Sequence, residues 1–116
     1  MDIEIDKLSI YGFGSFFNKR SDYKDIDILI IHQSTSYQSC QFAIWCKKRL
    51  RELMSELDVT ILSESEEHQL SFIIKSKAVS IGKIDENSAL YDIWLIFEEL
   101  IRFKDKRGIN SKVLKF

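Results

Sequence analysis

The alternation of apolar and polar residues indicates where the strands of this chain lie. In residues 6–13, apolar side chains such as Leu8 and Ile10 occupy every second position, which is typical of a strand with one buried face. Residues 25–32 are almost continuously apolar after Asp27, which predicts a central strand covered on both faces. Two further segments are also expected to form strands: residues 57–62 and 78–84.

Apolar positions that recur every three or four residues indicate the helices. Residues 37–56 form the longest such segment. Its inner stripe is expected to be Ala43, Cys46, Leu50, Leu53, Met54 and Leu57. A second helix is predicted over residues 65–75, with Ser63 or Ser65 as its N-cap. A last helix is predicted from a cap at Asn87-Ser88 to about Lys106, and its inner face is expected to be Ile93, Trp94, Phe97, Leu100 and Ile101.

The order of these elements predicts the fold class. Strand, strand, helix, strand, helix, strand and helix follow one another along 116 residues. This order is typical of an α/β (α+β) domain in which a small mixed sheet is packed with helices. The length and the 45% of hydrophobic residues favour one globular domain over residues 1–116.

The composition limits the compartment and the classes of partner that are expected for this chain. The net charge is −1, so no overall field favours nucleic acid or an anionic membrane, and nucleic acid is a less favoured partner. Neither a signal peptide nor a membrane span is expected from the sequence, which favours the cytoplasm. Cys40 and Cys46 lie six positions apart on a predicted helix, on different sides of it, so no disulfide is expected.

Three aspartates stand at positions that favour metal binding. Asp25 and Asp27 alternate on one strand, so their carboxylates point the same way, about 7 Å apart at ~3.3 Å per residue. Asp58 lies near the start of the third predicted strand and completes a three-acid cluster if that strand neighbours the second. Carboxylates are the ligands that Mg²⁺ and Mn²⁺ prefer, and such a cluster supports phosphoryl or nucleotidyl transfer. Asp58 could also serve as the general base.

A short turn precedes the acidic strand. Gly14 allows the backbone to turn tightly and approach a phosphate, and the Ser15 hydroxyl adds a donor. Lys19 and Arg20 are within reach of a phosphate tail in the sequence. Either the Gly-Ser pair or the Asp-x-Asp pair alone would most often be a plain turn or a solvated strand edge. Their combination favours a nucleotide-phosphate site.

These motifs carry a family resemblance. Phe13-Gly14-Ser15, followed after nine residues by Asp25-Ile26-Asp27-Ile28, resembles the phosphate-binding turn and metal-binding strand of the polymerase-beta-like nucleotidyltransferase superfamily. Asp58-Val59-Thr60 resembles its third acidic strand. The size of the chain is similar to that of the minimal nucleotidyltransferases, the antitoxin-like members. The residues between Ser15 and Asp25 depart from the triplet that many of those members carry.

The resemblance implies a transferase that moves a nucleotidyl group to an acceptor hydroxyl. The group would be AMP from ATP, or the corresponding group of another nucleoside triphosphate. It implies Asp25, Asp27 and Asp58 as catalytic and metal-binding residues, and Gly14 and Ser15 as phosphate-binding residues, with Mg²⁺ or Mn²⁺ as the cofactor. Similar small proteins often pair with an all-helical HEPN-type toxin in a toxin–antitoxin system and add AMP to it. The resemblance therefore also implies a HEPN-type partner protein.

The rival hypothesis is a module of the same fold that acts by binding and not by catalysis. The last predicted helix is apolar beyond its inner face, at Leu90, Tyr91, Leu95, Ile96 and Phe103. A helix that is apolar over so much of its girth is either deeply buried or contacts another chain. The pattern thus favours a partner or self-association through this helix.

Other residue clusters have plainer interpretations. His32 and His68 have no Cys or acid at metal-ligand spacing, so surface or capping roles are expected for them. The basic cluster Lys47-Lys48-Arg49 with Arg51 is typical of a solvated helix face, and RNA or another acidic partner is the alternative.

Overall fold

The computed structural model of the chain describes residues 7–18, 20 and 22–108. Four strands form one mixed sheet: β1 (Lys7–Phe13), β2 (Ile26–His32), β3 (Leu57–Ser63) and β4 (Val79–Asp85). Their spatial order is β3-β2-β1-β4. β2 and β3 are parallel, whereas β1 is antiparallel to both β2 and β4. The expected mixed α/β class is confirmed.

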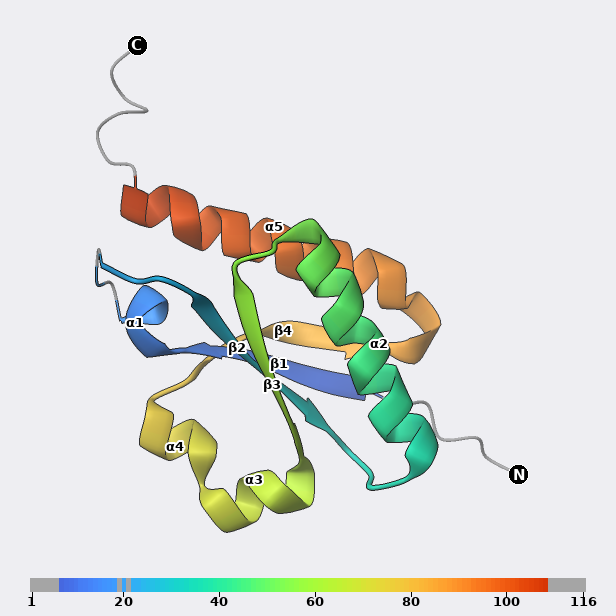
Figure 1. The fold of residues 1–116 in the computed structure, drawn as a ribbon. Coiled ribbons are helices and arrows are strands. Elements are labelled where there is room, and N and C mark those ends of the chain that lie inside the picture. The colour runs from blue at the N-terminus through green and yellow to red at the C-terminus, as the bar shows by residue number, and fades with distance from the viewer. Residues whose placement is uncertain (1–6, 19, 21, 109–116) are drawn as a thin grey trace.

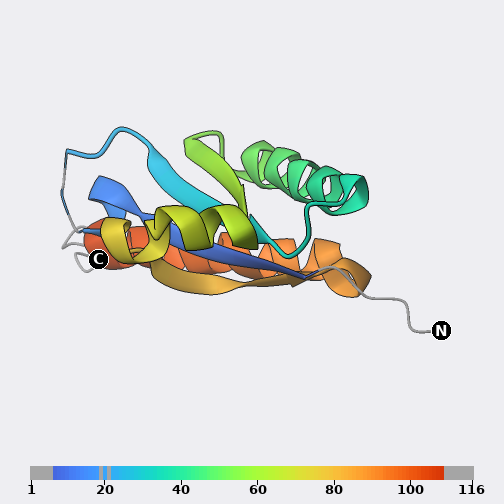
Figure 2. The ribbon, with the colours of Figure 1, turned by 90° about the horizontal axis from the view of Figure 1, so that it is seen from below.

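Helices cover both faces of the sheet, as Figures 1 and 2 show. The long helices α2 (Tyr37–Leu53) and α5 (Ala89–Gly108) lie on one face. The shorter helices α3 (Glu64–Leu70) and α4 (Phe72–Ser76) lie on the other. The remaining elements are the single turn α1 (Gly14–Phe17) and the 3₁₀ turn η1 (Glu86–Ser88). No helix in the part of the chain that the structure describes is long and apolar enough to cross a membrane.

The core lies between the sheet and the two long helices. β2 contributes Ile26, Ile28 and Ile30 to this side, all fully buried. Leu29 and Ile31 are buried as well, on the opposite side of the same strand. The expectation that β2 is a central strand covered on both faces is therefore confirmed, and its burial fixes the register of the neighbouring strands.

The long helix α2 ends earlier than the apolar pattern predicted. It stops at Leu53, and Met54 has an extended backbone (φ −147°). Ala43, Cys46 and Leu50 are buried as expected, but Leu53 is 40% exposed. The chain must turn at once into β3, whose Leu57 pairs with Ile26, so the requirements of the sheet end the helix here.

The predicted helix over residues 65–75 is two helices. Its N-cap is Ser63, whose hydroxyl accepts from the Glu66 backbone N–H at 3.1 Å while the Glu66 carboxylate accepts from the Ser63 N–H at 2.8 Å. Ser71 adopts a left-handed conformation (φ 50°) and breaks the helix. The break lets α4 turn so that Phe72 packs edge-on against Phe13 of β1, with 5.0 Å between ring centroids.

The buried stripe of α5 is rotated from the predicted one. Ile93, Ile96 and Leu100 are buried, so Ile96 belongs to the inner face. Trp94, which the pattern assigned to the inner face, is 47% exposed and packs against the ring of Phe97. The C-terminal part of the helix is tied to the start of β3 by Lys104, whose Nζ lies 3.1 Å from both carboxylate oxygens of Glu56.

The two cysteines are free thiols, as expected from their spacing. Cys46 is buried against the sheet, and burial raises the pKa of its thiol to about 12. It therefore stays protonated and acts as a small apolar core residue. Cys40 is half-buried on another side of α2.

Candidate functional site

Two of the three predicted acids lie side by side on neighbouring strands. The parallel register of β2 and β3 places Asp27 directly opposite Asp58. The neighbours of Asp27 in β2, Ile26 and Ile28, point into the core, so Asp27 points to the opposite face, on which α3 and α4 lie. Because directly opposed residues share a face, Asp58 projects to the same side.

The third acid, Asp25, lies just before β2 and is exposed. Its charge still reaches the site: the pKa of the Asp27 carboxyl is raised by partial burial first, then by the charge of Asp58, then by that of Asp25. Like charges held near one another in a partly buried position favour protonation of one of them. The three carboxylates therefore form one electrostatic unit.

The turn after β1 packs directly against this unit. Gly14 has a φ of +80°, a conformation that side chains with a Cβ rarely adopt. A Cβ at this position would also overlap the Oδ2 atom of Asp27. Phe13 pairs with Asp27 across the strands, so the turn begins beside the acid. The backbone conformation therefore favours glycine, and a Cβ here would in addition displace the Asp27 carboxylate.

Aromatic packing holds the turn in place. Ser15 belongs to the single helical turn α1 and is half-buried. The adjacent Phe16 is fully buried and contacts the ring of Tyr23 edge-on at 4.8 Å between centroids. Phe17 packs in the same way on Phe103 of α5, at 5.2 Å. Phe16 and Phe17 therefore anchor the turn between the sheet and α5.

Of the two bases predicted to bind phosphate, Lys19 and Arg20, the structure describes Arg20, whose side chain is bonded to a neighbouring acid. The Arg20 guanidinium donates to both carboxylate oxygens of Asp22, at 3.2 and 3.1 Å. This side-chain bond is the first cause that holds the pKa of Asp22 below its ordinary value. Arg20 is thus engaged by its own loop, on the surface. Lys19 lies outside the described residues.

The fold places a further base, Lys77, at the same end of the sheet as Gly14. Val79 of β4 pairs with Gly12, two residues before Gly14. Lys77, two residues before Val79, is exposed and left-handed (φ 57°). The sequence held no signal for this placement, because it follows from the β1–β4 register and from the break between α3 and α4.

The donor set suits a hard divalent cation, since carboxylate oxygens are the ligands that Mg²⁺ and Mn²⁺ prefer. Partial burial and then the charges of Asp58 and Asp25 raise the pKa of Asp27, and such a cation would relieve the repulsion between the carboxylates. Within the described part of the chain, however, no group of three or more His, Cys, Asp or Glu side chains is arranged so that it could hold a metal ion. Asp27 and Asp58 are neighbours on the sheet and Asp25 lies just before it, but the three side chains are not grouped closely enough to hold an ion between them as they stand.

The histidines lie elsewhere. His32, at the far end of β2, is buried; its Nδ1 lies 2.7 Å from the Ser34 carbonyl oxygen and 3.2 Å from the Ser39 hydroxyl. His32 thus links β2 to the first turn of α2. Of its two expected roles, surface or capping, the surface role is wrong, because the side chain is buried. His68 is exposed on α3.

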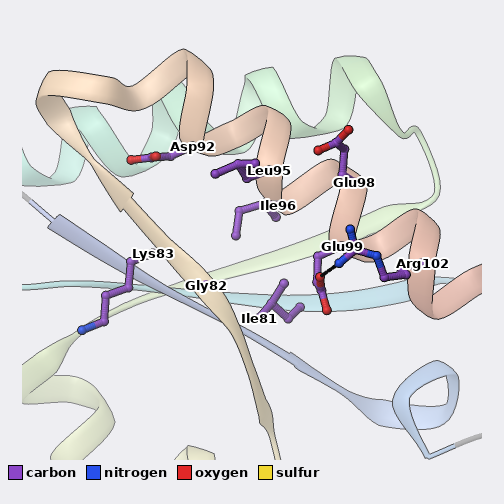
Figure 3. Close-up of a pocket in the computed structure, with 9 residues that line it drawn as sticks. All are labelled: Ile81, Gly82, Lys83, Asp92, Leu95, Ile96, Glu98, Glu99 and Arg102. Atoms are coloured by element: carbon purple, nitrogen blue, oxygen red, sulfur yellow. Dashed lines mark hydrogen bonds and ion pairs between the residues drawn. The ribbon is translucent and has the colours of Figure 1, made fainter.

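A hollow between β4 and α5 offers no comparable site. Figure 3 shows that Lys83 and Glu98 point away from the space between the two elements. Arg102 and Glu99 pair with each other at 2.8 Å. The Asp92 carboxylate accepts from the Asp85 backbone N–H and the Ser88 hydroxyl. Asp92 therefore bonds to groups that precede α5, and Arg102 and Glu99 pair on the surface of this helix.

No protein-family model, curated protein or solved structure matches the chain.

Proposed function

We propose that this protein is a metal-dependent nucleotidyltransferase. The observation that supports the proposal most is the register that sets Asp27 opposite Asp58, with Gly14 packed against the Asp27 carboxylate. A glycine turn that approaches phosphates and a pair of neighbouring carboxylates are the parts that positioning a nucleoside triphosphate requires.

The proposed roles follow from these positions. The backbone at Gly14 and the Ser15 hydroxyl bind the triphosphate. Asp25 and Asp27 would hold Mg²⁺ or Mn²⁺, and Asp58 would be the third ligand or the base that accepts the proton of the attacking hydroxyl. Asp58 suits the base role because it is exposed and can meet an acceptor that arrives from solvent. When bound, the metal supplies neutralisation of the triphosphate and a lower pKa for the acceptor hydroxyl.

In this proposal the acceptor oxygen attacks the α-phosphorus of ATP, the bond between the α- and β-phosphates breaks, AMP stays on the acceptor and pyrophosphate leaves. The acceptor is a hydroxyl, on a HEPN-type toxin protein or another molecule. These two assignments rest on the resemblance of the motifs. The protein would work in the cytoplasm, where ATP and reduced cysteines coexist.

A labelling experiment tests the transfer. The protein is incubated with its co-purifying proteins and Mg²⁺, with ATP that carries the label on the α-phosphate or on the γ-phosphate. Nucleotidyl transfer retains only the α label on the acceptor, whereas a kinase would retain only the γ label. Asp58→Asn should abolish α labelling, and Asp105→Asn, an exposed acid on α5, should leave it unchanged. Labelling that survives Asp58→Asn would contradict the proposal.

A second function, binding without catalysis, is favoured by one observation. Leu90, Tyr91, Trp94 and Leu95 of α5 are all more than 40% exposed. An apolar surface of this kind marks contact with another chain, either a HEPN-type partner or a second copy. Under this alternative, the α-phosphate label is absent from every variant while binding to the partner persists.

A further inference from the structure

The two edge strands of the sheet, β3 and β4, differ in how well they are protected against pairing with a further strand. β4 has an irregular register with β1 between Ile10 and Tyr11, and it carries Gly82 and Lys83. Such bulges, glycines and lysines discourage pairing with another strand. β3 pairs with β2 in a continuous register over all seven of its residues and contains neither proline nor lysine. In Figure 2 β3 forms the outer margin of the sheet.

A hollow of about 520 Å³ lies between this edge and α2. Its walls are the apolar side chains of Ile44 and Ile61, three bases and one acid. The charged residues are Lys47, Lys48, Arg51 and Glu52. Glu52 is already engaged by Arg49 at 3.0 Å. The hollow is therefore positive, with an apolar floor, and its volume is in the range of ligand sites, roughly 300–1,000 Å³.

The bases in this hollow are not neutralised within the protein. Lys47, Lys48 and Arg51 form no ion pair with any other residue that the structure describes. Elsewhere on the described surface, Arg20, Arg49, Arg102 and Lys104 each have an acidic partner, whereas Lys77, Lys83 and Lys106, like the bases of the hollow, form no ion pair with a described residue. Unpaired positive charge beside an open strand edge is complementary to an acidic segment.

We propose that the β3 edge and this hollow bind an extended acidic peptide segment of a partner protein, which adds a strand to the sheet. Ile61 faces α2, so alternate side chains of the added strand would meet the bases of the hollow. The side chains between them would meet Thr60 and Leu62 on the other face, where Asp58 repels acids. The preferred segment thus has acids at every second position and uncharged residues between. The inference does not depend on the transfer reaction.

The test uses a labelled peptide of about ten residues in which glutamate and valine alternate, at about 0.15 M salt. Fluorescence anisotropy should show binding by the full chain. The same peptide with lysine in place of glutamate, and the glutamate peptide N-methylated at every backbone amide, should each bind at least about tenfold more weakly. The lysine peptide removes the charge match, and N-methylation removes backbone donors to the strand edge.

The protein variants give the matched comparison. Lys48→Glu/Arg51→Glu should weaken binding of the glutamate peptide at least about tenfold, whereas Lys83→Glu/Lys106→Glu changes the net charge equally away from the hollow and should have less than about a twofold effect. Unchanged circular dichroism would show that the variants fold, and Lys48→Gln/Arg51→Gln provides a milder change. Equal effects of the two double variants would overturn the proposal. So would equal binding of the N-methylated peptide, tighter binding of single-stranded oligothymidine, or no binding of the glutamate peptide.

Discussion

At the scale of single residues, Gly14 joins the turn to the acids. Its φ of +80° would cost a residue with a Cβ about 1–2 kcal/mol, and the Cβ would overlap Asp27. Gly14→Ala should therefore lower the free energy of unfolding in urea by about 2 kcal/mol. Ser15→Ala, at the next and half-buried position, should change it by less than about 0.5 kcal/mol. Equal stability of Gly14→Ala and the wild type would show that the turn does not have this conformation.

Asp27 should make stability depend on pH. Burial, Asp58 and Asp25 raise its pKa above the ordinary value of 3.8, so the folded state binds this proton more tightly than the unfolded state does. The free energy of unfolding should thus fall as the pH rises from about 3.8 through the raised pKa, and stay low above it.

Asp27→Asn should remove the loss of stability that accompanies ionisation of Asp27. The variant should be more stable than the wild type near neutral pH, and the two stabilities should approach each other below the ordinary pKa of 3.8, in urea titrations across this range. Asp105→Asn, which replaces an exposed acid, serves as the control and should follow the wild type. An Asp27→Asn variant that is less stable near neutral pH would mean that the carboxylate stabilises the fold.

At the scale of elements, the capping box at Ser63 and Glu66 fixes where α3 begins. Ser63→Ala leaves the Glu66 backbone N–H without its acceptor, which should cost about 1 kcal/mol in urea denaturation. Ser65→Ala lies in the first turn of the same helix, at an exposed position, and should cost less than about 0.5 kcal/mol. Similar costs for both serines would mean that the cap does not contribute to stability.

The periodicity of the sequence predicted the strands within one or two residues, because the inward positions of β1, β2 and β3 are consistently apolar. It could not locate the ends of α2 or the break at Ser71, since both depend on how the chain must return to the sheet. Similarly, Asp27 and Asp58 could be identified as acids near strand starts, but their pairing depends on the order of the strands. The position of Lys77 depends on a register that no local pattern encodes.

At the scale of the whole molecule, the exposed apolar surface of α5 should determine association. Trp94 is the largest side chain in it and is 47% exposed. Sedimentation velocity should show association that grows with concentration, and Trp94→Glu should shift the protein toward monomer. Tyr37→Glu, at the exposed start of α2, should have no such effect. A monomeric wild type at all concentrations would exclude self-association and leave a different partner for this surface.

The central claim, that Gly14 and the three acids form a site for a metal-bound nucleotide, is tested most directly by thermal unfolding with ATP and Mg²⁺. Ligand at about ten times its Kd should stabilise the folded protein by about 1.4 kcal/mol, which raises the Tm by roughly 5 °C. ATP without Mg²⁺ should give a smaller shift, and Asp25→Asn/Asp27→Asn should give none, while Asp105→Asn shifts as the wild type does. A wild-type protein whose Tm does not change at millimolar ATP with Mg²⁺, or an equal shift in the double variant, would contradict the claim.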